Sequence, residues 1–366
     1  MTARRLHVLV VDDSAVVREA MTLVLSSVPG VIVTTAADPI IARRKIAADR
    51  PDVILLDLEM PREDGLHFLR ELIATDPIPV VICSSHTTAG SNVALEALRE
   101  GAIDVVAKPR FGVREFVRES AILIVDAVRA AARARVHTRG GWRVDPQPAR
   151  TADRAVPAGT PSSRMVAIAA STGGPQALRE VLSTLPANMP GIVVVQHMPA
   201  GFTNAFARHL DRECEIAVKE AENGDLIIDG RVLIAPGDQH LAVVRRNGRL
   251  AVEVLGGPLV MRHRPSADLL FRSTARVAGA AAMGVIMTGM GDDGADALCA
   301  MRNAGAPTIA QDEASCIVFG MPREAILRGG ATRVAPLGAI APLIAHWARE
   351  GELRDAPRKS QANHTH

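Results

Sequence analysis

Short apolar runs alternate with segments of helical period along most of the chain, and they form two blocks. In the first block the runs are rich in Val and Ile, and several are apolar on both faces, as buried parallel strands are. The expected strands are 6–12, 31–37, 53–58, 79–85 and 102–109, with helical stretches such as 14–28 and 91–101 between them. The alternation predicts an α/β fold, a flavodoxin-like (βα)5 doubly wound sheet whose ligand crevice lies at the carboxyl ends of its strands.

The second block repeats this alternation from residue 165 onward. The expected strands are 165–171, 191–197, 231–238, 250–256, 283–289 and 306–312, and the expected helices are 174–185, 202–210, 266–279 and 293–304. The pair Asn247-Gly248 is a turn signal and indicates a hairpin. The pattern predicts a second doubly wound, Rossmann-like α/β domain.

The periodicity is lost between the blocks and again at the C-terminus. The stretch 136–163 is rich in Pro, Gly and Arg without apolar period, which is typical of a linker. We therefore expect a first domain at 1–135, a flexible linker at 136–163, a second domain at 164–352 and a disordered tail at 353–366.

Net charge, cysteine content and hydropathy argue against several classes of protein. The formal net charge is +2, from 42 basic and 40 acidic residues, which argues against a nucleic-acid-binding face. Four scattered cysteines suit free thiols in a reducing cytoplasm. The first residues do not read as a signal peptide, and the stretch 277–291 is too short and too rich in Gly to span a bilayer of about 30 Å. We expect a soluble, cytoplasmic protein without membrane insertion.

Carboxylates end two strands of the first predicted sheet. Asp12 and Asp13 end the first strand and Asp57 ends the third, and these strands are neighbours in a 2-1-3-4-5 sheet. Oxygen ligands of this kind suit Mg²⁺. Ser84 and Lys108 end the fourth and fifth strands at the same rim. The set favours phosphoryl transfer to Asp57 as nucleophile, whereas helix capping is the ordinary alternative for any one of these aspartates.

The segments VVDDS, LLDLEMPREDG, SS and AKP resemble the receiver domain of two-component response regulators over residues 6–130. The resemblance implies that Asp57 takes the phosphoryl group and that Asp12, Asp13 and Asp57 hold Mg²⁺. It also implies that Ser84 and Lys108 read the phosphorylated state.

A serine and a histidine follow two strands of the second predicted sheet. Ser171 lies at a strand-to-helix turn before TGGP, where a helix N-terminus offers N–H groups to an anion. A capping serine is the alternative interpretation. His197 ends the next strand, at the crevice, where it can act as a general base. His240 and His263 are rival bases because they also lie in expected loops.

The segment MTGMGDDGADAL supports two interpretations. Asp293 lies just past a strand and can orient a catalytic imidazole, while the backbone N–H of Met290 can stabilise an oxyanion. The same segment spells GxGxxG between a strand and a helix, with Asp312 about 20 residues beyond, as in a dinucleotide-binding fingerprint. Against a nucleotide, Asp292 and Asp293 stand where a pyrophosphate would approach.

Six segments resemble the catalytic domain of chemotaxis protein-glutamate methylesterases over about residues 164–350. They are AASTGGP, VVQHMPAGFTNAFARHL, APGDQHL, HRPSADLLFRS, TGMGDDGADAL and QDEASCIVFGMP. The resemblance implies Ser171 as nucleophile, His197 as base, Asp293 as the orienting acid and the Met290 amide as oxyanion donor. Family members often carry Asn before the acid, where this chain has Asp292.

This resemblance implies hydrolysis of glutamyl methyl esters, and deamidation of glutamines, on the cytoplasmic helices of methylated chemoreceptors. The phosphodonor would be a chemotaxis histidine kinase, and the esterase domain would need no cofactor. The candidates for contact with an acidic receptor helix are Arg208, His240, Arg264 and Arg272, although ordinary exposure to solvent is the favoured interpretation for each. A receiver-gated nucleotide-dependent enzyme that uses the GMGDDG loop and a non-catalytic signalling adaptor are the competing functions.

Overall fold

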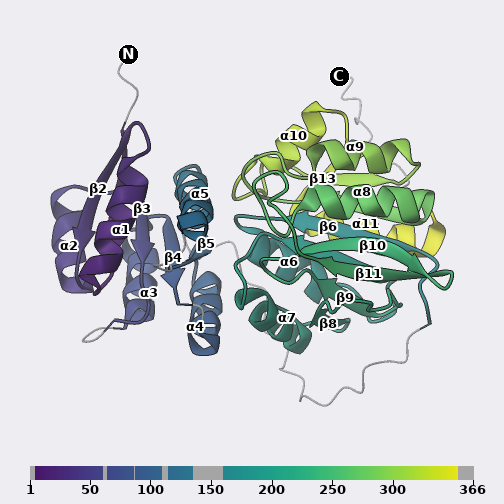
Figure 1. Cartoon of the computed structure of the whole chain (residues 1–366), viewed down its shortest axis with the longest axis horizontal. Coiled ribbons are helices and arrows are strands. Elements are labelled where there is room, and N and C mark those ends of the chain that lie inside the picture. The colour runs from purple at the N-terminus through teal and green to yellow at the C-terminus, as the bar shows by residue number, and fades with distance from the viewer. Residues whose placement is uncertain (1–4, 61–63, 86, 109–113, 135–159, 353–366) are drawn as a thin grey trace, which may run out of the picture.

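The computed structural model describes residues 5–60, 64–85, 87–108, 114–134 and 160–352, and for residues 88–89 and 114–120 it describes the backbone alone. Figure 1 shows two α/β bodies side by side, the first from the N-terminal part of the chain and the second from the C-terminal part. The predicted α/β class is confirmed for both. Within the described residues, no helix is long and apolar enough to cross a bilayer.

The first body is built on a five-stranded parallel sheet in the order β2-β1-β3-β4-β5, as the strand pattern predicts. Its strands are β1 (Leu6–Val11), β2 (Val31–Ala36), β3 (Val53–Leu56), β4 (Val80–Ser84) and β5 (Asp104–Ala107). Its helices are α1 (Ala15–Ser26), α2 (Pro39–Ala48), α3 (Gly65–Thr75), α4 (Thr88–Arg99) and α5 (Arg114–Ala131). Apolar residues of α1 and α5 cover one face of the sheet, and those of α2, α3 and α4 cover the other.

The second body contains a seven-stranded parallel sheet in the order β14-β13-β12-β6-β7-β9-β8. Its strands are β6 (Met165–Ala170), β7 (Gly191–Gln196), β8 (Ala217–Glu220), β9 (Arg231–Ile234), β12 (Ala282–Ile286), β13 (Thr308–Gln311) and β14 (Arg333–Ala335). The strand order reverses between β6 and β12, which makes this junction the switch point where doubly wound sheets bind ligands.

Helices cover both faces of this sheet. The helices are α6 (Gly174–Ser183), α7 (Phe202–Glu213), α8 (Ala267–Val277), the 3₁₀ turn Gly279–Ala281, α9 (Ala295–Asn303), α10 (Met321–Leu327) and α11 (Leu337–Glu350). Buried residues of α6, α7 and α11 share one apolar cluster, and those of α8, α9 and α10 share another with the hairpin.

The hairpin expected around Asn247-Gly248 is confirmed as β10 (His240–Arg246) and β11 (Arg249–Leu255). These antiparallel strands form a sheet of their own. The expected strand 250–256 therefore belongs to the hairpin and not to the main parallel sheet. The four cysteines are free, as expected.

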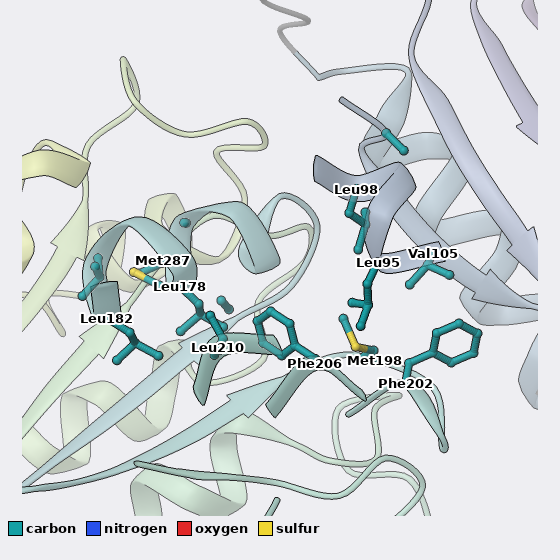
Figure 2. Packing of buried hydrophobic residues seen from close by; sticks show 14 of the residues in the cluster. Leu95, Leu98, Val105, Leu178, Leu182, Met198, Phe202, Phe206, Leu210 and Met287 are labelled. Carbon is teal, nitrogen blue, oxygen red and sulfur yellow. The ribbon is translucent and has the colours of Figure 1, made fainter. Parts of the chain in front are cut away.

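The two bodies share one apolar cluster across their boundary. Leu95 and Leu98 of α4 belong to the same buried cluster as Met198 and Phe206 of the second body. Figure 2 shows Leu95 pointing toward Met198. The helix α4 packs on α7 and α6, so the surface formed by α4, β5 and α5 faces the second body (Figure 1).

Most of the expected linker and the whole expected tail lie outside the described residues. The last residues of the linker are an exception. Pro161 forms a bridge with Ile228, and the hydroxyl of Ser162 accepts a hydrogen bond from the N–H of Gly191 at 2.8 Å. The packed part of the second body thus begins before residue 164, where the sequence pattern placed it.

Candidate active site

Ser171 lies at the switch point of the second sheet, directly after β6. Its N–H donates to the carbonyl of Thr288 at 3.0 Å, and its own carbonyl accepts from the N–H of Gly174 at 2.7 Å and from Nε2 of Gln196 at 2.9 Å. The residue is only 8% exposed. These bonds to the loop after β12, to α6 and to β7 fix the turn that carries the hydroxyl.

His197 and Asp293 are hydrogen-bonded, with 2.8 Å between Nε2 of His197 and Oδ2 of Asp293. The carboxylate of Asp293 also accepts from the hydroxyl of Ser266 at 2.8 Å and from the N–H groups of Ala267 at 2.7 Å and Asp268 at 3.0 Å. It therefore stands at the N-terminus of α8. A carboxylate has about four lone-pair sites, and these four donors occupy them.

This environment determines the charge state of the pair. Burial alone would raise the pKa of Asp293, but the hydrogen bond from His197 and the bond from the Ala267 N–H outweigh it, and the pKa is lowered. Ionised Asp293 accepts the proton on Nε2 of His197, which leaves the lone pair on Nδ1. Nδ1 is buried and has no hydrogen-bond partner among the described residues.

His263, a rival base by sequence, stacks on His197. The ring centroids are 3.8 Å apart and the planes differ by 9°. The Nδ1–H of His263 donates to the carbonyl of Met261 at 2.8 Å. Burial, and then the neighbouring His197, lower its pKa to about 3, so the ring is neutral. His263 thus packs against the proposed base instead of replacing it.

A strained turn holds His263 in this place. The N–H and carbonyl groups of Val260 and His263 exchange hydrogen bonds of 3.1 and 2.9 Å across the turn. The two central residues, Met261 and Arg262, have φ values of 48° and 68°, a region that suits Gly or Asn. Such residues cost about 1–3 kcal/mol each and gather at functional sites.

The loop that carries Met290 packs directly on the serine. A Cβ at Gly289 would lie 2.7 Å from Cβ of Ser171, so the close approach requires glycine. The N–H groups of Gly320 and Met321 both donate to the carbonyl of Gly289, at 3.0 and 2.8 Å. The start of α10 therefore clamps the loop next to Ser171.

The other features of the GxGxxG pattern also have local causes. Gly291 and Gly294 both have φ of 86°, and a Cβ at Gly294 would lie 2.9 Å from Ala267. Asp312 accepts from the N–H and hydroxyl of Ser315, so it caps a turn. These contacts account for the pattern through packing, without a nucleotide.

Asp292 is turned away from the imidazole. Its carboxylate pairs with Nη2 of Arg328 at 2.7 Å, and Arg328 also pairs with Asp296 at 2.9 Å. The acid in contact with His197 is therefore Asp293, the residue that the sequence analysis favoured.

Ser171, His197 and Met290 line one cavity of about 220 Å³. The ligand atoms of His197, His263 and Asp293 lie within 4.8 Å of one another, as in some metal sites. Here, however, both oxygens of Asp293 already accept hydrogen bonds from His197, Ser266 and the N-terminus of α8, so they are not open to a metal ion. The cavity thus brings together a hydroxyl, an imidazole oriented by a carboxylate, and the backbone of a glycine-rich loop.

The four candidates for contact with an acidic helix lie in different surroundings. Arg208 bonds to Asn204 on α7, and Arg272 pairs with Asp268 on its own helix. His240 is buried and donates from Nε2 to the carbonyl of Pro258 at 2.9 Å. Only Arg264 lines the cavity, and its guanidinium is paired with Asp238 at 2.6 Å.

The first body gathers its acidic residues as predicted. Oxygens of Asp12, Asp13 and Asp57 lie within 4.8 Å of one another, with Asp12 and Asp57 buried and Asp13 exposed. Lys108 Nζ lies 2.7 Å from Oδ2 of Asp57 and 3.0 Å from Oδ2 of Asp12. Ser84, buried at the end of β4, donates to the carbonyl of Gly90 at 3.2 Å.

The charges of this cluster depend on one another. Burial raises the pKa of Asp12. Burial alone would lower the pKa of Lys108, but its bonds to Asp57 and Asp12 raise it above its ordinary value. The lysine therefore remains a cation, and the carboxylates form an acidic pocket suited to a divalent ion.

Comparisons with known proteins match each of the two bodies to a known family. Residues 166–344 match the CheB methylesterase family, and residues 8–118 match the response regulator receiver domain. A protein-glutamate methylesterase/protein-glutamine glutaminase of Anaeromyxobacter dehalogenans is 54% identical over 355 residues, which cover 95% of this chain and 98% of that protein. The chain belongs to the CheB methylesterase family.

Two further comparisons concern a second relative and a solved structure. Another protein-glutamate methylesterase/protein-glutamine glutaminase, from Xanthomonas campestris, is 55% identical over 91% of this chain and 98% of its own length. The crystal structure of the Thermotoga maritima CheB methylesterase catalytic domain is 39% identical, with a TM-score of 0.49, and covers 50% of this chain and 97% of that one.

In this CheB-family chain the receiver contacts the residue next to the serine. The hydroxyl of Thr172 donates to Oδ2 of Asp104, in β5 of the receiver, at 2.7 Å. Nε2 of Gln176 donates to the carbonyls of Leu98 and Ala102 at 3.1 and 2.9 Å. Burial raises the pKa of Asp104 to about 6.

Two ion pairs lie at the same boundary. Arg99 of α4 lies 3.5 Å from Glu213 of α7, and Arg262 lies 4.0 Å from Asp126 of α5. Residues of β5 and α5 also line the cavity of Ser171 and His197. The receiver therefore forms part of the wall of the site.

Sequence reasoning did not single out Asp104, Thr172, Gln176 or Arg262. Asp104 had a readable signal, since it is the one charged residue in the apolar run 102–107. The others have no local pattern, because the contacts that give them a role come from the packing of one body against the other.

Proposed function

We propose that this chain hydrolyses glutamyl methyl esters and deamidates glutamines on the cytoplasmic helices of chemoreceptors, under control of its receiver. The observation that carries the proposal is the fixed imidazole of His197. Asp293 holds its Nε2–H, and the buried Nδ1, in a cavity that Ser171 also lines, has no hydrogen-bond partner among the residues that the structure describes. Both relatives described above carry the same pair of activities in their names.

Each group has a defined part in the proposed reaction. Ser171 attacks the side-chain carbonyl carbon of the ester, and Nδ1 of His197 takes the serine proton. Asp293 stabilises the imidazolium that results. The N–H of Met290, on the loop packed against Ser171, donates to the developing oxyanion.

The second half of the reaction uses the same groups. Methanol leaves with the proton from His197, and the acyl group remains on Ser171. A water molecule then attacks the acyl carbon while His197 takes its proton, which releases the glutamate carboxylate and the serine. With a glutamine side chain the same steps release ammonia.

A chemotaxis histidine kinase would phosphorylate the receiver on Asp57. The protein would act in the cytoplasm, where the receptor helices lie. Asp12, Asp13 and Asp57 would hold Mg²⁺, since their oxygens converge in an acidic pocket. When bound, Mg²⁺ neutralises charge on the phosphoryl oxygens. Lys108 and Ser84 would contact the phosphoryl group. Lys108 would then bind the phosphoryl oxygens in place of the Asp57 oxygen that it contacts in this structure.

We further propose that the unphosphorylated receiver closes the catalytic cavity. Support comes from the bond between Asp104 and Thr172 and from the residues of β5 and α5 in the cavity wall. Phosphorylation would favour an arrangement in which this surface leaves the mouth of the site open to a receptor helix.

Substitution of Ser171 by Ala tests the central assignment. We expect methanol release from methylated receptor membranes to fall by about 10³-fold or more, since the nucleophile is lost. Phosphorylation of Asp57 should continue at the wild-type rate, and the exposed Ser163→Ala variant should keep full activity. A Ser171→Ala protein that still releases methanol would overturn the proposed function.

A further inference from the structure

Arg262 is a cationic residue at the catalytic cavity to which the proposed reaction assigns no part. It lines the cavity together with Ser171 and His197. Its side chain is 55% exposed, whereas Arg264, the other arginine of the lining, is 17% exposed and already paired with Asp238. Arg262 is therefore the arginine of the described lining best placed to receive an anion from outside.

The fold directs Arg262 toward the proposed oxyanion loop. Its backbone is held with φ of 68° in the turn that also presses His263 against His197. Its Nη2 lies 3.6 Å from the position that a Cβ on Gly291 would take, next to Met290. The guanidinium thus lies beside the place where an ester would react.

The closed structure brings a helical carboxylate up to this arginine. Asp126 of α5 lies 4.0 Å from Nη1 of Arg262, and its side chain is 19% exposed. Burial raises the pKa of Asp126, and Arg262 is the largest influence that opposes the rise. Leu123, Ile124 and Ala127 of the same helix line the cavity beside it. The receiver therefore covers the site with a helix that presents apolar side chains and one carboxylate.

We propose that Arg262 binds a carboxylate of the receptor helix close to the esterified glutamate, and that Asp126 of α5 occupies this place when the receiver covers the site. The inference rests on the proposed function. On a helix, side chains three or four residues apart are neighbours, so an acidic residue one turn from the ester falls beside the oxyanion loop. A guanidinium fork matches such a carboxylate in geometry and charge.

A pair of matched substrates tests the first half of the proposal. The phosphorylated full chain is given methylated receptor in which the acidic residues one turn from the esterified glutamate are kept or replaced by Ala. Wild type should show a kcat/KM about 10-fold higher for the acid-flanked substrate, through a lower KM. Arg262→Gln should bring this ratio close to one, and Arg249→Gln, an exposed arginine on the hairpin, should leave it at the wild-type value.

Three results would contradict this half. Equal kcat/KM values of wild type for both substrates would overturn the inference while the proposed function stands. An equal fall of kcat on both substrates in Arg262→Gln would assign the arginine to the reacting carbonyl instead. Failure of wild type to release methanol from either substrate would overturn the proposed function and this inference together.

A double-mutant cycle tests the second half, on the neutral-flanked substrate and without phosphodonor. Asp126→Asn and Arg262→Gln should each raise the rate severalfold, because each removes the contact that helps to hold α5 over the site. The double variant should be no faster than the faster single variant, since both changes remove one interaction. Independent, multiplying effects, or no rise in either single variant, would contradict the assignment of Asp126 to this position.

Discussion

Asp292 and Asp293 are adjacent in the chain, yet their carboxylates differ in burial and in the groups that they contact. Asp293 is 1% exposed and accepts from His197 and from the N-terminus of α8. Asp292 lies in a half-exposed ion pair with Arg328. A buried acceptor of the imidazole proton fixes the tautomer of the base, whereas a surface ion pair contributes little to stability or chemistry.

The two aspartates can be separated by amide substitution. Asp293→Asn should lower kcat for methanol release by about 10³- to 10⁴-fold, because the amide favours the wrong tautomer of His197. Asp292→Asn should stay within about 3-fold of wild type. Rates on methylated receptor membranes check this, and a larger loss in Asp292→Asn than in Asp293→Asn would reverse the assignment.

Residues at strand ends could be predicted because their position follows from the sheet. Ser171, His197 and Asp293 each follow a buried apolar run, and the carboxyl ends of parallel strands share one edge. The place of His263 could not be predicted, since it depends on a turn with positive φ at Met261 and Arg262. Neither residue type signals such a turn in sequence.

At the scale of elements, the segment that begins α10 holds the loop of Met290 in place. The N–H of Gly289 donates to the carbonyl of Val318, and the N–H groups of Gly320 and Met321 return bonds to the carbonyl of Gly289. This pairing gives a backbone donor a fixed position beside Ser171 before substrate arrives, which is the condition for effective oxyanion stabilisation.

Gly289→Ala tests this contact. The added Cβ would approach Ser171 Cβ to 2.7 Å and Met321 Sδ to 2.5 Å. We expect a loss of about 1–3 kcal/mol in the free energy of unfolding, from overpacking, and a fall of at least about 10-fold in the rate of methanol release.

The control for Gly289→Ala is Gly256→Ala, where a Cβ would meet nothing within 4 Å. It should change stability by less than about 0.5 kcal/mol. Urea unfolding followed by fluorescence of buried Trp347, in a Trp142→Phe background, checks both variants. Equal effects of the two substitutions would contradict the proposed packing role.

The sequence patterns missed two strands at the edges of the second sheet, and they also missed the helices α10 and α11. The strand β8 reads AVKE and lies at the edge of its sheet, and β14 has three residues with only Ala335 buried. Edge strands bury one face at most, so the apolar sequence pattern that predicts a strand is weak in them. The central strands β6 and β7 are fully buried and were predicted within a residue.

At the scale of the whole molecule, the receiver and the catalytic body meet through α4, β5 and α5. Leu95 and Leu98 of α4 pack in one apolar cluster with Phe206 of α7 (Figure 2). The hydrogen bond between Thr172 and Asp104 connects the receiver to the turn of Ser171. No sequence pattern predicts this arrangement, because it depends on two surfaces that are far apart in the chain.

Closure of the Ser171 cavity by the unphosphorylated receiver should be visible in the basal rate of the enzyme. The most direct test is the rate of methanol release from methylated receptor membranes by the Asp104→Ala full chain, compared with wild type, with and without a small-molecule phosphodonor. Loss of a buried hydrogen bond to a charged group, about 1.5–3 kcal/mol, should weaken closure. We expect an unphosphorylated rate at least about 10-fold above wild type and a smaller further rise with phosphodonor, while exposed Glu19→Ala behaves as wild type. An Asp104→Ala protein whose unphosphorylated rate stays as low as that of wild type, although Asp57 is still phosphorylated normally, would contradict it.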